Sequence, residues 1–460
     1  MQRFRSLSPT GRLRLALEFR TKATARNVVS GSTDAAKLAT WEDIVIKKLA
    51  FVLSCAAAFC VTSAFAQNAN LEKLSEFKTT GTPMMEPIPQ TGEHAEALKA
   101  IAAKIKVPDG FKVNLYAIVP DARHMAVGPQ GVVTFVGTRK ELVYSMTDRN
   151  KDRVADDVKV FAPSIKMTVP NGVCFSRDGH LYVVEQNRLL WFPGAEFYYE
   201  GPDVAAFDIV KQGELIPASN ESYNHTARTC RVGPDNRIYI TIGQPFNVPA
   251  PEVLPEFEKL GIGGIISMKQ DGTDRKIYAR GMRNPLGLDF NPKDKTLWVN
   301  DNQVDGMGDT IPPGEMNRVT GPGQNFGFPW YGGGKIRTVE YKDATVPEGV
   351  IFPEVEQEAH AADLGLSFYN GKQFPEKYRG GIFSTQHGSW NRVDPVGARV
   401  MFTSLKADGT ADKTEVFADG WLSENGEYLG RPVDVQMLKD GSLLVSDDLA
   451  GAVWRISYGD

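Results

Sequence analysis

The sequence predicts an all-β fold, a six-bladed β-propeller with long loops between the blades. One outline recurs six times: an apolar strand, a tight turn such as Asp178–Gly179 or Asp440–Gly441, and a second apolar strand rich in Val, Ile, Leu, Tyr and Trp. The content of Gly (44 residues) and Pro (28 residues) suits a chain with many turns. A pair of β-sandwiches is the alternative, but it does not explain a repeat count of six.

The six units follow one another at irregular spacing. They occupy residues 124–146, 171–192, 226–243, 284–301, 363–388 and 431–458. An alternating strand, Phe111–Ile118, precedes the first unit. We expect it to pair with the last unit, because closing the ring removes an exposed sheet edge. The propeller domain is therefore expected to span residues 109–460.

The segment before the propeller contains one long apolar run, Leu49–Val61, which follows two lysines and ends near Ala66. The run is short for a membrane span, so residues 45–66 are predicted to form a cleavable secretory signal peptide. We therefore expect a periplasmic protein without stable membrane insertion.

Two further N-terminal segments flank this signal. Residues 1–44 are interpreted as a candidate gene-start extension, because a start at Val45 gives a conventional short basic segment. Residues 67–108 are polar with a short helical pattern at Ala95–Ile105, and they are expected to be a lead-in rather than a domain.

Charge and cysteine content narrow the class of protein. The net charge of −4, with 23% charged and 42% hydrophobic residues, indicates a globular chain and makes nucleic acid an unsuitable partner. Outside the signal, only Cys174 and Cys230 remain. These two cysteines can be interpreted either as a disulfide or as two small buried residues. Their similar places in consecutive units favour the second interpretation.

The residues that begin each unit are expected to meet at one end of the central channel. They are Arg123, Asn171, His225, Arg283 with Asn284, His387 with Arg392, and Arg431. Four arginines on a mildly acidic protein indicate an anionic ligand with several carboxylates or phosphates, because a guanidinium offers two parallel donors.

Among the histidines, His225 is the favoured general base, with an expected pKa near the ordinary value of about 6.5. His180 and His360 are interpreted as bystanders, and His124 as a group that supports the site. The segment Asp301–Glu315 is rich in side-chain oxygens, glycine and proline, which is typical of a loop that holds a hard cation or a polar ligand.

Five motifs resemble those of one protein family. They are NHTARTCRVGPD, GMRNPLGLDFNP, DNQVDGMGDTIPPGEMNRVTGPGQNFGFPW, STQHGSWNR and LGRPVDVQMLKDGSLLVSDD. The chain resembles the soluble quinoprotein glucose and sorbosone dehydrogenases, which carry pyrroloquinoline quinone (PQQ) on a six-bladed propeller. It looks more like the sorbosone or pyranose dehydrogenase branch.

This resemblance implies roles for the candidate residues. His225 would take the hydroxyl proton of the substrate, and Arg283 and Asn284 would lie at the quinone and substrate oxygens. Cofactor carboxylates would be held by Arg392 and Arg431, and Arg123 would complete the basic shell around the cofactor. A calcium ion would polarise the quinone, largely through backbone carbonyls, with Gln303 and Asp305 as candidate side-chain ligands.

The chain departs from the family at two places. Gln244 stands where some relatives have an acidic residue that supports the histidine, so we expect a less activated His225. Phe246 and Pro249 stand where sorbosone-type relatives often have two cysteines, which implies altered substrate access.

The expected function is a periplasmic PQQ-dependent dehydrogenase for an aldose or a related sugar aldehyde or alcohol. No Cys-x-x-Cys-His motif is present, so electrons are expected to pass to a separate acceptor, a cytochrome c or the quinone pool. The alternatives are a calcium-dependent lactonase-like propeller hydrolase, disfavoured by arginines in place of carboxylates, and a non-enzymatic propeller binding module.

Overall fold

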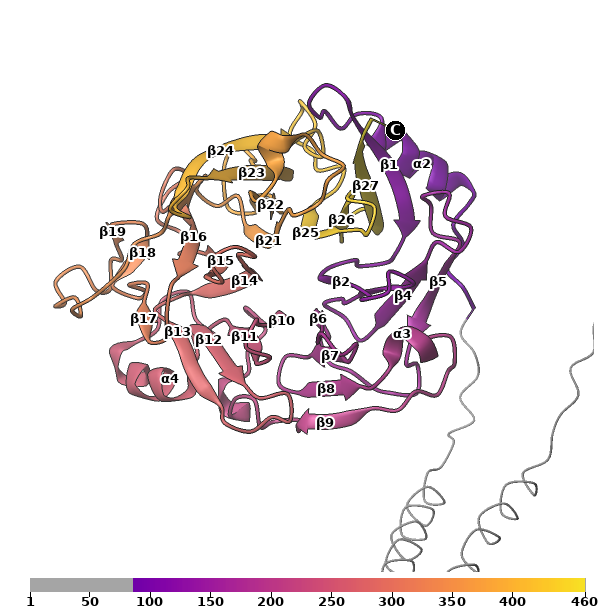
Figure 1. The fold of residues 1–460 in the computed structure, drawn as a ribbon. Helices are drawn as coiled ribbons and strands as arrows, with labels where there is room; N and C mark the ends of the chain where they lie inside the picture. Colours follow the sequence, from indigo (N-terminus) through magenta and orange to yellow (C-terminus); the bar gives the residue numbers. More distant parts are fainter. Residues whose placement is uncertain (1–85, 460) are drawn as a thin grey trace, which may run out of the picture. The chain divides into compact units, whose positions relative to one another are not determined.

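The computed structural model describes residues 86–459, and these form a six-bladed β-propeller, as the sequence predicted. Six antiparallel sheets surround a central axis, with the first strand of each sheet nearest that axis (Figure 1). The expected gene-start extension and signal peptide lie outside the described residues. Among the described residues, no helix is long and apolar enough to cross a membrane.

The first three blades follow one another in chain order. Their strands are β2 (Met125–Val127), β3 (Thr134–Val136), β4 (Val143–Thr147) and β5 (Asp157–Phe161); β6 (Gly172–Phe175), β7 (Leu181–Val184), β8 (Leu189–Phe192) and β9 (Phe207–Val210); and β10 (Cys230–Val232), β11 (Ile238–Ile242), β12 (Gly264–Met268) and β13 (Lys276–Arg280). The short strand β17 (Gln324–Asn325) extends the third sheet by pairing parallel to β13.

The last three blades complete the ring. Their strands are β14 (Asn284–Phe290), β15 (Leu297–Asn302), β16 (Gly314–Val319) and β20 (Val355–Gln357); β21 (Asp363–Phe368), β22 (Ile382–Gln386), β23 (Arg399–Leu405) and β24 (Ala411–Ala418); and β25 (Pro432–Met437), β26 (Leu443–Asp447), β27 (Ala452–Tyr458) and β1 (Phe111–Ile118). Smaller elements are the hairpin β18 (Tyr331–Gly333) and β19 (Ile336–Arg337), and the helices α2 (Glu93–Ala102), α3 (Ala195–Tyr198) and α4 (Leu254–Leu260).

The ring closes by pairing the first described strand with the last. Strand β1 lies antiparallel to β27, with Phe111 opposite Tyr458 and Ile118 opposite Ala452 (Figure 1). The Phe111 ring packs edge-on against Phe374 and Phe417, which anchors the start of β1 in the core beside blade 5. The predicted closure is confirmed.

A disulfide joins Cys174 on β6 to Cys230 on β10, so the interpretation of two reduced buried cysteines was wrong. The two residues lie on the innermost strands of adjacent blades, with their Cα atoms 5.8 Å apart. This separation is within the usual range for a disulfide. Sequence alone could not reveal the pairing, because it depends on how two neighbouring blades face each other.

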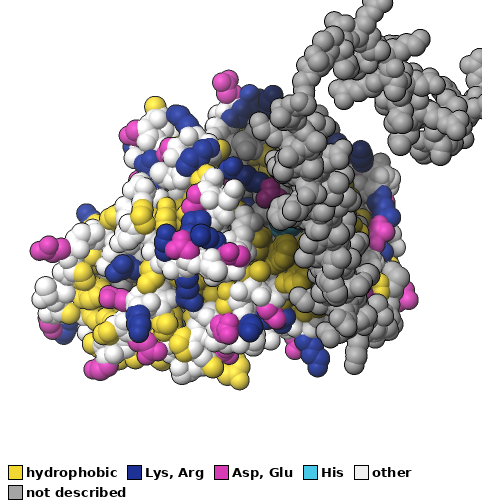
Figure 2. Space-filling model, turned by 60° about the horizontal axis from the view of Figure 1, so that its bottom comes forward, with side chains coloured by type: hydrophobic (Ala, Val, Ile, Leu, Met, Phe, Trp, Pro, Cys, Tyr) yellow, Lys and Arg dark blue, Asp and Glu magenta, His cyan; other side chains and the backbone are white. Residues whose placement is uncertain are grey.

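Antiparallel pairing within each blade brings two sets of residues to the same end of the channel. The first set precedes the first strand, and the second set follows the second strand, which runs back toward the starting end. The tight turns between these strands lie at the opposite end, where Gly179 and Gly441 have φ of 82° and 88°. On the face seen in Figure 2, acidic and basic side chains are interspersed, in agreement with the modest net charge.

Candidate active site

A cavity of about 530 Å³ lies at the end of the channel where these two sets of residues meet. Its wall is predominantly polar, and residues from blades 1, 3, 4 and 5 contribute to it. They include Arg123, Arg139, His225, Asn247, Arg283, Asn284, Gln303, Asp305, His360, Asp363, His387 and Trp390. The volume suits a small molecule or cofactor.

His225 projects into this cavity from the segment before β10. Its backbone has a φ of 52°, a left-handed conformation that is uncommon for a residue with a side chain. Imidazole Nδ1 lies 2.5 Å from the main-chain oxygen of Gln244, so Nδ1 carries the proton and donates it. Nε2 has no hydrogen-bond partner among the described residues, which leaves its lone pair free to accept a proton.

The environment of His225 favours the neutral imidazole. Burial, followed by the charge of Arg283, lowers the pKa of His225 to about 3. The expectation of a pKa near the ordinary value is therefore corrected. The buried Arg228, which the sequence analysis did not single out, donates from Nη1 to the main-chain oxygen of His225 at 2.7 Å and fixes its backbone.

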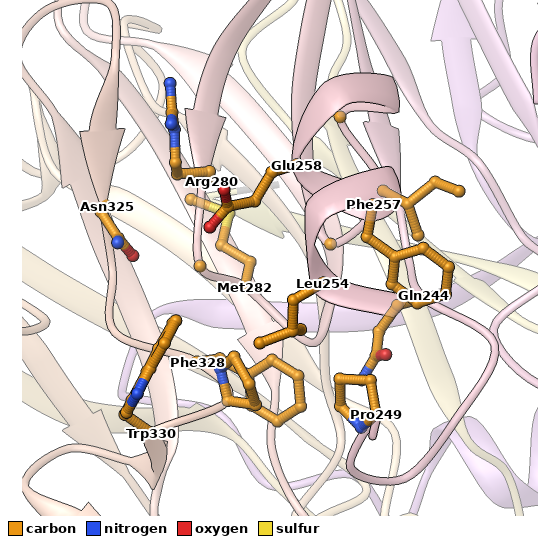
Figure 3. A pocket seen from close by; sticks show the side chains of 15 residues that line it. Gln244, Pro249, Leu254, Phe257, Glu258, Arg280, Met282, Asn325, Phe328 and Trp330 are labelled. Carbon is orange, nitrogen blue, oxygen red and sulfur yellow. The ribbon is translucent and has the colours of Figure 1, made fainter. Parts of the chain in front are cut away.

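Gln244 supports the site through its backbone and not through its side chain. Its N–H donates to the main-chain oxygen of Arg283 at 3.1 Å, while its carbonyl accepts from His225. The side chain lies in a separate small pocket beside Leu254 and Phe257 (Figure 3). The histidine is thus oriented by a group that every residue type provides, and the absence of an acidic side chain at position 244 removes no contact to it.

The close packing around the histidine requires a glycine at position 243. A Cβ atom on Gly243 would lie 2.5 Å from Asn284 Oδ1 and 2.9 Å from His225 Cβ. Glycine is therefore needed here for a close approach rather than for a left-handed backbone.

Arg283 and Asn284 are held by one buried carboxylate. Both oxygens of Asp301 accept backbone N–H groups, from Arg283 at 3.0 Å and from Asn284 at 2.7 Å. The Arg283 guanidinium donates to Asn247 Oδ1 at 2.9 Å and pairs with Asp305 at 2.5 Å. Asn284 Oδ1 is buried without a partner among the described residues, so it remains available to a ligand.

The other predicted arginines differ in their position. Arg123 lines the cavity and is paired with Asp448, while its Nε donates to Asn171 Oδ1 at 2.9 Å. Arg431 and Arg392 are not part of the cavity wall. Arg431 donates from Nε to the main-chain oxygen of His387 at 3.0 Å, and Arg392 lies 3.5 Å from Glu358. These two arginines hold loops around the site.

The two candidate calcium ligands differ in their availability. Both carboxylate oxygens of Asp305 are occupied, one by Arg283 and one by Asn391 at 2.8 Å. Gln303 Oε1, in contrast, is buried without a partner in the described part of the chain. Residues 86–459 contain no cluster of three or more His, Cys, Asp or Glu side chains that could hold a metal. Calcium prefers six to eight oxygen ligands, so the side chains alone do not form a calcium cage.

Several residues of the cavity wall were missed or set aside in the sequence analysis. His360, interpreted as a bystander, lines the cavity, and its Nε2 lies 2.7 Å from the main-chain oxygen of Gly308. His387 Nε2 lies 2.8 Å from Asp448 Oδ1, and Asn247 and Arg139 were not named at all. Arg139, Asn247 and Asp448 each follow the second strand of a blade, which is the signal that could have found them.

Fold and cavity together define a class of six-bladed propellers that hold a ligand in a polar cavity at one end of the channel. The family model for glucose and sorbosone dehydrogenases matches residues 208–455, and the protein belongs to this family.

Two relatives in sequence illustrate its range. An uncharacterized protein of Borreliella burgdorferi is 30% identical over 372 residues, 79% of this chain and 93% of the relative. The aldose sugar dehydrogenase YliI of Escherichia coli is 27% identical over 202 residues, 41% of this chain and 46% of the relative.

Solved structures reproduce the fold at low sequence identity. The PQQ domain of a pyranose dehydrogenase from Coprinopsis cinerea has a TM-score of 0.60 and 16% identity, covering 82% of this chain and 99% of that chain. A Trichoderma reesei enzyme of carbohydrate-active family AA12 has a TM-score of 0.64 and 17% identity, covering 77% and 98%. At these identities the likeness establishes the propeller fold.

Proposed function

We propose that this protein is a periplasmic PQQ-dependent dehydrogenase that oxidises an aldose or a related sugar aldehyde or alcohol. The observation that carries the proposal is the unpartnered Nε2 of His225 in one cavity with Arg283 and Asn284. Membership of the glucose and sorbosone dehydrogenase family and the likeness to an aldose sugar dehydrogenase support it.

The proton chemistry follows from the state of His225. Oxidation of a hydroxyl-bearing carbon removes a hydride from carbon and a proton from oxygen. Neutral Nε2 accepts that proton, while the N–H at Nδ1 keeps its hydrogen bond to the carbonyl of Gln244 and holds the ring in place. Asn284 Oδ1 can accept a hydrogen bond from a second substrate hydroxyl, and the Arg283 guanidinium provides positive charge beside the developing carbonyl oxygen.

The cavity fits the proposed cofactor in size and charge. PQQ, when bound, would supply the oxidant that accepts the hydride. Arg123 and Arg283 line the cavity and would face its carboxylates. A calcium ion bound with it would take Gln303 Oε1 as its side-chain ligand, and main-chain and cofactor oxygens would have to complete the coordination.

The periplasmic location is supported by the Cys174–Cys230 disulfide, because such bonds persist in oxidising compartments. Electrons would leave to a separate acceptor, a cytochrome c or the quinone pool. The lactonase-like alternative needs a metal held by carboxylates, whereas Asp305 in this cavity is engaged by Arg283 and Asn391, and residues 86–459 contain no cluster of side chains that could hold a metal.

The test is reconstitution of the purified apo-protein with PQQ and calcium. We expect a bound quinone absorption band and reduction of an artificial dye upon addition of an aldose. The variant Arg177→Gln, at an exposed turn outside the cavity, is the matched control and should behave like wild type. Absence of any quinone band at saturating PQQ and calcium would refute the proposal.

A further inference from the structure

Arg139 differs from Arg123 and Arg283 at the channel end, because its guanidinium forms no hydrogen bond or ion pair with the described residues. Arg123 is paired with Asp448, and Arg283 is paired with Asp305. Arg139 lines the same cavity, yet within residues 86–459 its guanidinium has no hydrogen-bond or ion-pair partner. Its backbone N–H alone is engaged, by Asp121 Oδ2 at 2.8 Å.

The backbone that carries Arg139 is fixed on both sides. The main-chain oxygen of Gly137 accepts from the N–H of Arg123 at 3.0 Å, and the N–H of Thr138 donates to the main-chain oxygen of Pro170 at 3.3 Å. The main-chain oxygen of Lys140 accepts from Val169 at 2.8 Å. Because these hydrogen bonds already fix the main chain around Arg139, a ligand that binds its guanidinium does not have to order the backbone. This lowers the entropic cost of binding.

The surrounding charge also favours a negative partner. Partial burial, followed by the neighbouring charge of Arg123, lowers the pKa of the Arg139 guanidinium, while the more weakly acting carboxylates of Asp448 and Asp121 oppose this shift. The charge of Arg139 in turn contributes to the low pKa of His225, behind burial, Arg283 and Arg228. Arg139 therefore lies within electrostatic reach of the candidate base, and an anion bound there would relieve the repulsion among these cations.

We propose that Arg139 binds a carboxylate of the ligand that occupies this cavity. A guanidinium presents parallel N–H donors that match a carboxylate in geometry as well as charge. The inference rests on the proposed function, in which two molecules could bring this carboxylate: the quinone cofactor, or an acidic sugar substrate such as a hexuronic acid. In the second case, the substrate class would extend from neutral aldoses to sugar acids.

The test uses the full-length mature protein with Arg139→Gln and Arg139→Lys, and with Arg177→Gln as the exposed-arginine control. In the first arm, PQQ is titrated into each apo-protein in the presence of calcium, and binding is followed by the quinone absorption band. A cofactor carboxylate at Arg139 predicts a ten- to hundredfold weaker affinity in Arg139→Gln, with partial recovery in Arg139→Lys.

The second arm measures KM for a neutral hexose and for the matching hexuronic acid at saturating PQQ. A substrate carboxylate predicts that Arg139→Gln raises the ratio of KM for the hexuronic acid to KM for the hexose about tenfold or more. Arg139→Gln should fold normally, because the residue is largely exposed and its guanidinium has no hydrogen-bond or ion-pair partner to lose among residues 86–459. If the variant matches wild type in both arms, Arg139 binds no carboxylate and this inference alone fails. If wild type binds no quinone, the proposed function fails and the inference falls with it.

Discussion

Nδ1 of His225 and the main-chain oxygen of Gln244 lie 2.5 Å apart, so the backbone orients the candidate base. The N–H of the same residue, Gln244, donates to the main-chain oxygen of Arg283, so Gln244 connects the His225 ring to the backbone that carries Arg283. Because both contacts come from the main chain, the geometry of the base depends on the fold at position 244 more than on the residue type there.

Replacing His225 by Gln should lower turnover by about 10²- to 10⁴-fold, because a positioned base contributes roughly this factor. Folding and PQQ affinity should persist, since the ring projects into the cavity and lies outside the apolar core. Single-turnover reduction of the bound quinone, together with thermal unfolding, measures both. A fully loaded variant with near wild-type turnover would remove His225 from the mechanism and direct attention to His387.

Replacing Gln244 by Leu should leave turnover within about threefold of wild type, because the carbonyl that holds His225 remains. Both polar atoms of the Gln244 side-chain amide are buried without partners within residues 86–459, so an apolar side chain of similar size should be neutral or slightly stabilising. Steady-state kinetics and urea unfolding test this. A large loss of turnover with unchanged stability would show that the side chain, and not the backbone, supports the base.

Replacing Gly243 by Ala should reduce turnover much more than Gln244→Leu. The new Cβ atom would meet Asn284 Oδ1 at 2.5 Å and His225 Cβ at 2.9 Å, so at least one of them must move. A misplacement of a catalytic group by about 1 Å can lower the rate about a hundredfold. Gly321→Ala is a suitable control, because nothing lies within 4 Å of a Cβ atom there. Equal turnover in the two variants would argue against close packing at His225.

The sequence predicted those parts of the site that a repeat makes visible. Arg123, His225 and Arg283 precede the first strand of a unit, so alignment of the six units placed them at one end of the channel, and the structure brings them to one cavity. Arg139 and Asn247 follow a second strand. They become apparent only when the antiparallel return of that strand is considered.

Other features depend on distances that no repeat pattern contains. Arg431 begins a unit, yet its guanidinium turns to the loop at His387 and lies over the Tyr428 ring at 4.9 Å. The expectation that it holds cofactor carboxylates came from its position in the unit and from the family motif. Similarly, the Cys174–Cys230 disulfide can be identified only when the relative orientation of the two adjacent blades is known.

The Cys174–Cys230 disulfide should stabilise the protein by roughly 4 kcal/mol, because it closes a loop of 56 residues in the unfolded chain. Oxidised protein produced as residues 67–460 should therefore contain no free thiol, and a reductant should lower its urea midpoint. The double variant Cys174→Ala with Cys230→Ala should start at the lower midpoint and not respond to reductant. Two free thiols in the oxidised protein would contradict the pairing.

The buried Asp434 should make stability depend on pH above the ordinary range of a carboxyl. Burial raises the pKa of Asp434 to about 7 and outweighs the hydrogen bonds from Met125 and Gln436 and the charge of Arg231, which lower it. Both hydrogen bonds go to Oδ2, and Oδ1 is buried without a partner among the described residues. The folded protein thus retains a proton that the unfolded chain releases near pH 4. Between these values the folded state binds more protons, so its stability falls as pH rises toward 7, by on the order of 1.4 kcal/mol per pH unit.

Asp434→Asn should abolish this contribution, since an amide cannot ionise and its oxygen can still accept from the N–H of Met125. Relative to wild type, the variant should gain stability steadily from pH 5 to pH 7 and little more above pH 8. Urea unfolding of the two apo-proteins across this range gives the difference directly. Because every other titrating group is common to both proteins, their contributions cancel. Parallel curves for the two proteins would mean that Asp434 is ionised in the folded state at neutral pH, with its second oxygen solvated or paired.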